Sequence, residues 1–234
     1  DIAEVASRVV DPELCRDLHT MGMLRGASVA GSNAHVLVAL PTDDWPVKEA
    51  LSDLIEAAIK DLEGVQSVSV EFTAMDEAEQ AAIRNHLIGD PSSTGGAQQA
   101  HGHAEGRLVS FAEPGNRTRV ILVASGKGGV GKSSVTANLA IALAQRGLRT
   151  GVIDADVWGF SIPRMLGVSR PPTVIDQMVI PVEANGVRCI SMGFFAREDQ
   201  PVIWRGPMLH KALEQFLTAV HWDDPDYLLL DLPP

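Results

Sequence analysis

The 234-residue sequence is poor in cysteine and has no cluster of basic residues. Its two cysteines, Cys15 and Cys189, are too few for a disulfide scaffold. Lysine and arginine number 19 against 30 acidic residues, which argues against a nucleic-acid or anionic-membrane surface. No apolar run approaches the roughly 20 residues of a membrane span, and the N-terminus lacks the pattern of a secretion signal. These absences leave a globular cytoplasmic protein as the expectation.

Composition divides the chain into two predicted domains and a linker. Residues 1–88 are expected to form a small α/β domain, and residues 117–234 a larger one. Between them, residues 89–116 are rich in Gly, Ser, Gln, His and Pro, which is typical of a flexible linker. No Cys or carboxylate cluster accompanies His101 and His103 in that linker, so an incidental polar tract is favoured over a metal site.

Periodicity predicts the elements of the first domain. A helix at the N-terminus ends before Pro12, residues 36–40 and 68–72 alternate as strands, and residues 76–87 form a short helix. The clearest helix follows Pro46, with Asp44 as a candidate N-cap and Gly64 as the stop. Its predicted apolar stripe consists of Val47, Leu51, Leu54, Ile55, Ala58 and Leu62.

Strands and helices alternate in the second domain. Strands are predicted at 119–125, 150–154, 187–192 and 226–231, and helices at 132–146 and 207–220. This order favours a mostly parallel sheet flanked by helices and joined by right-handed crossovers. Such a sheet normally has more strands than the sequence supplies, so the C-terminal part of this α/β fold is expected to be truncated.

A phosphate-binding loop is predicted between the first strand and the first helix of this domain. Gly126, four residues, Gly131, Lys132 and Ser133 match its pattern, and the strand–loop–helix order is the one that the mechanism requires. Backbone N–H groups and the helix dipole would hold phosphate oxygens, Lys132 would reach the β- and γ-phosphates, and the Ser133 hydroxyl would ligate Mg²⁺. The predicted nucleotide-binding residues are Gly126, Lys127, Gly128, Gly129, Val130, Gly131, Lys132, Ser133 and Ser134.

Three aspartates follow apolar strands of the same domain. Asp154 and Asp156 come after residues 150–153, and Asp231 after Tyr227–Leu230. Ligands bind at the carboxyl ends of parallel strands, so these side chains are expected beside the phosphate loop. Asp154 and Asp231 are predicted to join Ser133 in holding Mg²⁺, and Asp156 to orient the water that attacks the γ-phosphate. A solvated acidic turn is the alternative for Asp154 and Asp156.

Lys127, directly after the first glycine, resembles the signature lysine of the deviant-loop ATPases that include MinD, ParA and nitrogenase iron protein. That resemblance implies a homodimer in which Lys127 reaches the partner's phosphates, and catalytic roles for Lys127, Lys132 and Asp156. A closer similarity within this superfamily is carried by Ser125–Ser134, Asp154–Pro163, Trp204–Met208, Asp231–Pro234 and Val10–Leu14. In these segments the chain resembles the Mrp-type iron–sulfur cluster carriers, with a small iron–sulfur assembly domain at the N-terminus.

The resemblance implies that ATP is bound and slowly hydrolysed to gate delivery of an iron–sulfur cluster to apoproteins, with assembly factors as further partners. The cluster, of 4Fe–4S type, is implied for the complete protein only, because the Cys-x-x-Cys pair of such carriers would lie beyond Pro234. No cluster ligand is therefore expected in this chain, and Cys189 is predicted to be a buried thiol. Trp45 also stands where the small domain often has a cysteine.

Two other functions fit parts of the sequence. A positioning ATPase of the MinD/ParA kind would act on a membrane or DNA surface, and it needs a basic or amphipathic docking segment that the sequence lacks. A third interpretation makes the N-terminal domain the functional core, with ATP as a structural ligand. Co-sedimentation with liposomes and with DNA in the presence of ATP tests the first alternative, and the absence of ATP turnover in the full-length protein would favour the second.

Overall fold

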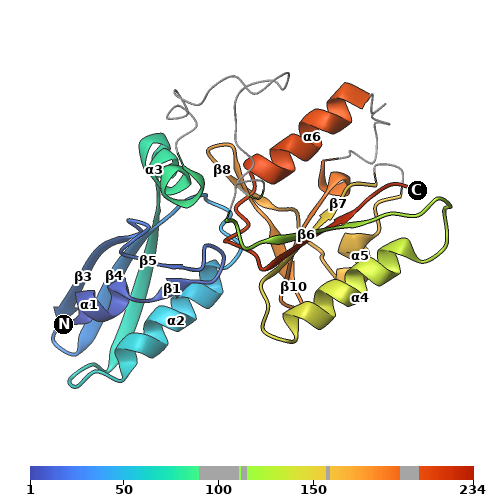
Figure 1. Cartoon of the computed structure of the whole chain (residues 1–234). Helices are drawn as coiled ribbons and strands as arrows, with labels where there is room; N and C mark the ends of the chain where they lie inside the picture. Colours follow the sequence, from blue (N-terminus) through green and yellow to red (C-terminus); the bar gives the residue numbers. More distant parts are fainter. Residues whose placement is uncertain (90–110, 112–114, 157–158, 196–205) are drawn as a thin grey trace. The chain divides into compact units, whose positions relative to one another are not determined.

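The structure is a computed structural model that describes residues 1–89, 111, 115–156, 159–195 and 206–234. The chain divides into two compact units, Asp1–Asp90 and Pro91–Pro234, and each is described by itself. Figure 1 shows the elements of both units, coloured along the sequence. Most of the expected linker, with His101 and His103, lies outside the described residues, so the division into domain, linker and domain stays a prediction.

The first unit is a three-stranded sheet with helices packed on it. The strand order is β3-β4-β5, with β3 antiparallel and β5 parallel to β4. Helix α1 contacts β3 and α2, and α2 contacts β5 (Figure 1). The elements are α1 (Ile2–Ser7), β1 (Val10–Asp11), β2 (Arg16–Asp17), β3 (Leu24–Ala30), β4 (Asn33–Leu40), α2 (Lys48–Lys60), β5 (Ser67–Ala74) and α3 (Glu77–Ile88).

Helix α2 confirms the predicted apolar stripe only in part. Leu51 and Ile55 are buried as expected, and Val47, Ala58 and Leu62 are partly buried. Ile59, which was not in the predicted stripe, is buried with Leu51 and Ile55 because their four-residue spacing places them on one helix face. Leu54 was expected in the stripe but is 44% exposed. The N-cap prediction was wrong: the helix starts after Val47, which makes no side-chain cap hydrogen bond, so Asp44 lies too far upstream.

The second unit contains a five-stranded sheet in the order β10-β11-β7-β12-β6. Strands β11, β7, β12 and β6 are mutually parallel, and β10 is antiparallel to β11. This confirms the mostly parallel sheet. The elements are β6 (Arg119–Val123), α4 (Lys132–Ala144), β7 (Thr150–Asp154), α5 (Ile162–Leu166), β8 (Thr173–Ile175), β9 (Met178–Ile180), β10 (Val182–Ala184), β11 (Val187–Ser191), η2 (Met192–Phe194), α6 (Gly206–Thr218) and β12 (Tyr227–Asp231).

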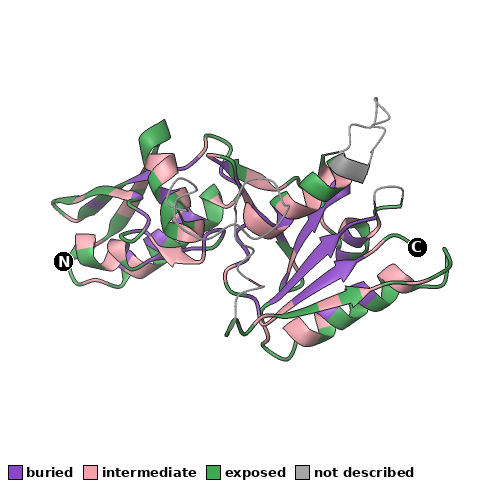
Figure 2. Ribbon diagram, turned by 45° about the horizontal axis from the view of Figure 1, so that its top comes forward, coloured by how far each residue is buried: buried purple, intermediate pink, exposed green. Residues whose placement is uncertain are grey.

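Two apolar layers cover the faces of this sheet. Alternate residues of each strand point to opposite faces, so Val152 of β7 packs in one layer and Ile153 in the other. The layer around Val152 includes residues of α4 and α5, and the layer around Ile153 includes Phe216 of α6 and Trp222. All five residues of β7 are buried, and Figure 2 shows the inner strands as buried along most of their length. A continuous apolar run is what such two-sided burial requires.

Short elements of this unit were not predicted from the sequence. Strands β8, β9 and β10 have three residues each, too few for a periodicity to be detected. Helix α5 has five residues. Among the helices of the described residues, none has the length and apolarity that crossing a bilayer requires.

Candidate functional site

Two of the predicted aspartates lie on neighbouring strands at the carboxyl edge of the sheet. Asp231, the last residue of β12, is in register with Val123 of β6 on one side and with Asp154 of β7 on the other. Asp154 is in register with Ser191 of β11. Because these four strands are parallel, all four residues meet at the edge where the loop after β6 begins. Ligands of such sheets bind outside this edge.

The glycine-rich loop between β6 and α4 has left-handed backbone conformations at two glycines. The φ angle is 74° at Gly129 and 90° at Gly131, which is the N-cap of α4. A side chain at either position would be strained. Within the described part of the chain, the backbone N–H groups of residues 126–134 donate no hydrogen bond to a protein acceptor. Unsatisfied N–H groups at a helix N-terminus are suited to binding an anion.

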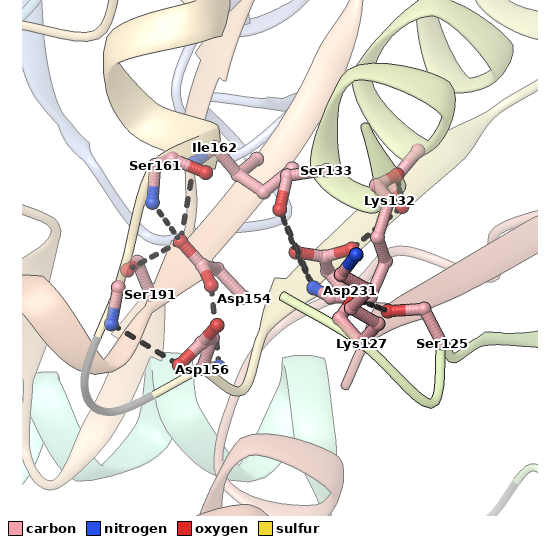
Figure 3. A network of polar contacts seen from close by, with 12 residues as sticks. Ser125, Lys127, Lys132, Ser133, Asp154, Asp156, Ser161, Ile162, Ser191 and Asp231 are labelled. Carbon is pink, nitrogen blue, oxygen red and sulfur yellow. Dashed lines mark hydrogen bonds and ion pairs between the residues drawn. The ribbon is translucent and has the colours of Figure 1, made fainter. Parts of the chain in front are cut away.

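Asp231 contacts three side chains of α4, of which Figure 3 labels Lys132 and Ser133. Its Oδ2 lies 2.6 Å from Lys132 Nζ and accepts a 2.6 Å hydrogen bond from Ser133 Oγ. Its Oδ1 accepts a 2.7 Å hydrogen bond from Thr136 Oγ1. The Lys132 and Asp231 side chains are 7% and 0% exposed. The strand that supplies Asp231 is therefore tied to the first helical turn after the glycine-rich loop.

Asp154 is the centre of a second polar network. Its Oδ2 accepts hydrogen bonds from the backbone N–H groups of Ser161 and Ile162, at 3.0 and 3.2 Å, and from Ser191 Oγ at 3.2 Å. Its Oδ1 accepts from the Asp156 N–H at 3.3 Å. Figure 3 shows these groups converging on one carboxylate. Asp154 thus holds the start of α5 and the end of β11 against β7.

The electrostatic environment of Asp154 disfavours its charge. Burial raises the pKa of the Asp154 carboxyl to about 6, and the negative charge of Asp231 adds to the rise. The hydrogen bonds that Asp154 accepts, among them those from Ile162 and Ser191, act in the opposite direction. The negative charge of Asp231 thus adds to the cost of ionising Asp154, and a nearby cation would lower that cost.

Asp156 and Lys127 differ in exposure, because Asp156 is buried whereas Lys127 is exposed. Asp156 Oδ1 accepts a 3.1 Å hydrogen bond from the Gly159 N–H. Lys127 is exposed, and its backbone oxygen accepts a 3.0 Å hydrogen bond from Ser125 Oγ. The structure thus brings Lys132, Ser133 and Asp231 into direct contact. Val157, Trp158, Trp204 and Arg205, which contributed to the sequence resemblance, lie outside the described residues.

Two side chains of these networks, Thr136 and Ser191, were not predicted from the sequence. Both are fully buried polar residues. Thr136 lies four residues after Lys132 in the predicted helix, and that spacing places both on one face. This signal was available in the sequence. Ser191 could not be found in the same way, because its contact with Asp154 depends on strand order.

The donor set at Asp231 suits Mg²⁺. A carboxylate and a hydroxyl are hard oxygen ligands, and Mg²⁺ in nucleotide sites is bound by one or two such groups together with phosphates. Among the described residues, no group of three or more His, Cys, Asp or Glu side chains forms an all-protein metal site. The residues present therefore fit a cation that arrives with a nucleotide.

The two cysteines differ in their surroundings. Cys189 of β11 is buried, and burial raises the pKa of its thiol far above the ordinary range. Cys15 is partly exposed, has a φ of 53°, and its Sγ lies 3.6 Å from the Pro12 carbonyl oxygen. The predicted burial of Cys189 is confirmed.

The parallel sheet, the glycine-rich loop before α4 and the aspartate at the end of β12 define a P-loop NTPase. Two family models match the chain: ParA, described as NUBPL iron-transfer P-loop NTPase, over residues 116–234, and the iron–sulfur cluster assembly protein model over residues 1–72. The chain belongs to the NUBPL iron-transfer P-loop NTPase family.

Similar proteins have names that agree with this family. Proteins called iron–sulfur cluster carrier protein are 42% identical in Mycobacterium leprae and 36% identical in Synechocystis, each over 100% of this chain. The matching protein of Deinococcus radiodurans is 41% identical over 97% of the chain. The chain spans 58%, 60% and 57% of the lengths of these three relatives. A solved nucleotide-binding protein of Archaeoglobus fulgidus in complex with ADP is 38% identical, with a TM-score of 0.43 over 50% of this chain and 46% of that one.

Proposed function

We propose that the chain is the ATP-binding and ATP-hydrolysing part of an iron–sulfur cluster carrier that delivers clusters to apoproteins. The observation that carries this proposal is the convergence of Lys132 and Ser133 on Asp231 beside a loop whose N–H groups have no protein acceptor in the described residues. We infer the cargo, an iron–sulfur cluster, from the names of the relatives. They favour a carrier over a positioning ATPase acting on a membrane or DNA.

The phosphates would be bound by the loop. The N–H groups of residues 126–134 would contact phosphate oxygens, and Lys132 would exchange Asp231 for the β- and γ-phosphates. Ser133 and Asp231, with Asp154 behind them, would hold Mg²⁺. When bound, Mg²⁺ neutralises negative charge on the transferred phosphoryl group in the transition state.

Hydrolysis would proceed by in-line attack of water on the γ-phosphorus, which breaks the bond to ADP and forms inorganic phosphate. Asp156 would orient the water and accept its proton. Lys132 would stabilise the transferred phosphoryl group from its own subunit, and Lys127 from the partner subunit of a homodimer. The exposure of the Lys127 side chain is compatible with a contact across a dimer.

We place cluster ligation in the part of the longer relatives that this chain does not span. Cys189 is buried, and a bridging cluster normally uses four thiolates. Apoproteins and assembly factors are the proposed partners, and the cytoplasm is the proposed compartment. Anaerobic reconstitution of this chain should yield no stoichiometric cluster, and one that forms would contradict this placement.

Hydrolysis and dimerisation have their own tests. Asp156→Asn should bind Mg-ATP as the wild type does but release phosphate at least about 100-fold more slowly, as expected for loss of a proton acceptor. Light scattering with a non-hydrolysable ATP analogue should give a dimer that Lys127→Ala weakens. Undiminished phosphate release by Asp156→Asn would refute its role, and a monomer with the analogue would refute the dimer.

A further inference from the structure

We propose that Thr136 is a positioning residue that fixes the Asp231 carboxylate for a divalent cation bound together with a nucleoside phosphate. The proposal rests on the proposed nucleotide site and adds a residue outside the phosphate-binding loop. Thr136 is fully buried in the first turns of α4, and its Oγ1 lies 2.7 Å from Asp231 Oδ1.

The two oxygens of Asp231 have different partners. Oδ2 accepts hydrogen bonds from Lys132 Nζ and Ser133 Oγ, whereas Oδ1 accepts one from Thr136 Oγ1. Thr136 Oγ1 also lies 3.1 Å from the Lys132 carbonyl oxygen. A hydroxyl carries one proton, so the shorter contact to the charged acceptor is its stronger hydrogen bond. Oδ1 is therefore held by a group that is distinct from the loop residues.

This division matters when a nucleotide binds. Lys132 and Ser133 are the groups that would turn to phosphate and cation, so Oδ2 would lose both of its protein partners. The terminal torsion of an aspartate is broad, and a carboxylate held at neither oxygen can rotate. Thr136, one helical turn beyond Lys132, would keep Oδ1 in place while Oδ2 exchanges partners.

The experiment compares nucleotide binding with and without Mg²⁺ in the full 234-residue chain. Thr136→Val removes the hydroxyl at nearly constant shape, and Thr136→Ser retains it. Thr150→Val is the matched control, because Thr150 is a buried threonine of the same unit whose Oγ1 bonds the Leu148 carbonyl. Calorimetric titrations with ADP are run in EDTA and over a series of Mg²⁺ concentrations, and thermal melting monitors folding.

In EDTA, all variants should bind ADP within about two-fold of the wild type. The Mg²⁺ concentration for half-maximal enhancement of binding should rise about ten-fold in Thr136→Val, the scale of losing one hydrogen bond to a charged group. Thr136→Ser and Thr150→Val should stay within about two-fold of the wild type. A purely structural role would not move the Mg²⁺ dependence alone.

An unchanged Mg²⁺ dependence in Thr136→Val overturns this proposal and leaves nucleotide binding standing. A wild type that binds no ADP in either condition overturns the proposed function and this proposal with it. Where Thr136→Val does not fold, Thr136→Ala takes its place with the same expected outcome.

Discussion

Lys132 and Asp231 form a buried ion pair, with Nζ 2.6 Å from Oδ2. Taking two charges out of water is costly, and it is compensated here by mutual attraction and by the hydroxyls of Ser133 and Thr136. The lysine that would meet phosphate is thus held against the carboxylate that would meet the cation. Nucleotide binding would exchange these partners within a site that is already folded.

The ion pair predicts a double-variant result. Lys132→Met leaves Asp231 buried without its counter-charge and should lower the free energy of unfolding by about 3–5 kcal/mol. Lys132→Met combined with Asp231→Asn removes both charges and should cost much less than Lys132→Met alone. Urea denaturation of the second unit measures both. Equal losses for the single and the double variant would show that the pair is not coupled.

Asp154 predicts a pH dependence of stability. Because its pKa is about 6 in the fold against an ordinary 3.8, the stability that it contributes is fully present below the ordinary value and is lost as pH rises through about 6. The difference in unfolding free energy between wild type and Asp154→Asn should therefore fall by about 1 kcal/mol from about pH 5 to about pH 7. Denaturation in EDTA at both pH values measures it, and a difference that rises with pH would contradict the assignment.

The hydrogen bonds of Asp11, one of them from Trp45, predict that Asp11 stabilises the first unit. Trp45 is buried, and its Nε1 donates a 2.9 Å hydrogen bond to Asp11 Oδ2, while Oδ1 accepts from the Glu13 and Leu14 N–H groups. In Asp11→Asn, the side-chain NH₂ group would face one of these N–H donors, and that donor would lose its acceptor. The free energy of unfolding should therefore fall by about 1–3 kcal/mol. Asp43→Asn, at an exposed position, is the control, and thermal melting of the first unit is the measurement. A loss no larger than that of the control would show that the three contacts add nothing to stability.

The packing around Gly151 in the second unit leaves no room for a side chain at this position. A Cβ at this position would lie 2.7 Å from a Trp222 ring carbon and 2.9 Å from Leu228 Cδ1. Overpacking of this kind costs about 1–3 kcal/mol, so Gly151→Ala should lower the melting temperature. Gly26→Ala, where a Cβ meets nothing within 4 Å, provides the comparison. Equal melting temperatures for the two variants would contradict the packing around Trp222.

The cysteines predict selective alkylation. Cys189 is 0% exposed, and burial raises the pKa of its thiol, so little thiolate forms. In the native chain, iodoacetamide should modify Cys15 and spare Cys189, whereas both should react in denaturant. Peptide mass spectrometry distinguishes the two sites, and Cys15→Ser should abolish native labelling. Rapid native modification of Cys189 would contradict its place in the sheet.

Much of the larger unit followed from local sequence signals. Apolar runs that end in aspartate predicted β7 and β12, and the glycine pattern predicted the loop before α4, because burial on both sheet faces and phosphate binding each leave a local signature. Strand β3 has no such signature. Its residues include Arg25, Gly26 and Ser28 and do not alternate between apolar and polar.

The networks around the aspartates could be predicted only in part. Ser133 and Asp231 were expected to lie together at a cation, but the ion pair of Lys132 with Asp231 was not predicted, because it depends on β12 lying beside β6 in the sheet. The contact of Ser191 with Asp154 requires knowing that β11 lies beside β7, and neither residue type nor spacing reveals this neighbour. Asp44 was a plausible cap by residue type, but the helix begins farther on, since backbone geometry decides the boundary.

The central claim is that residues 126–134 bind the phosphates of ATP, and calorimetric titration with Mg-ATP tests it most directly. The full chain and the exposed-site control Lys60→Met should bind one equivalent with the same affinity. The charge-balanced Lys132→Met/Asp231→Asn variant, folded by its melting curve, should bind at least about 20-fold more weakly, the scale of losing a hydrogen-bonded charge. Equal affinity in the wild type and this double variant, or no binding by the wild type, would contradict the claim.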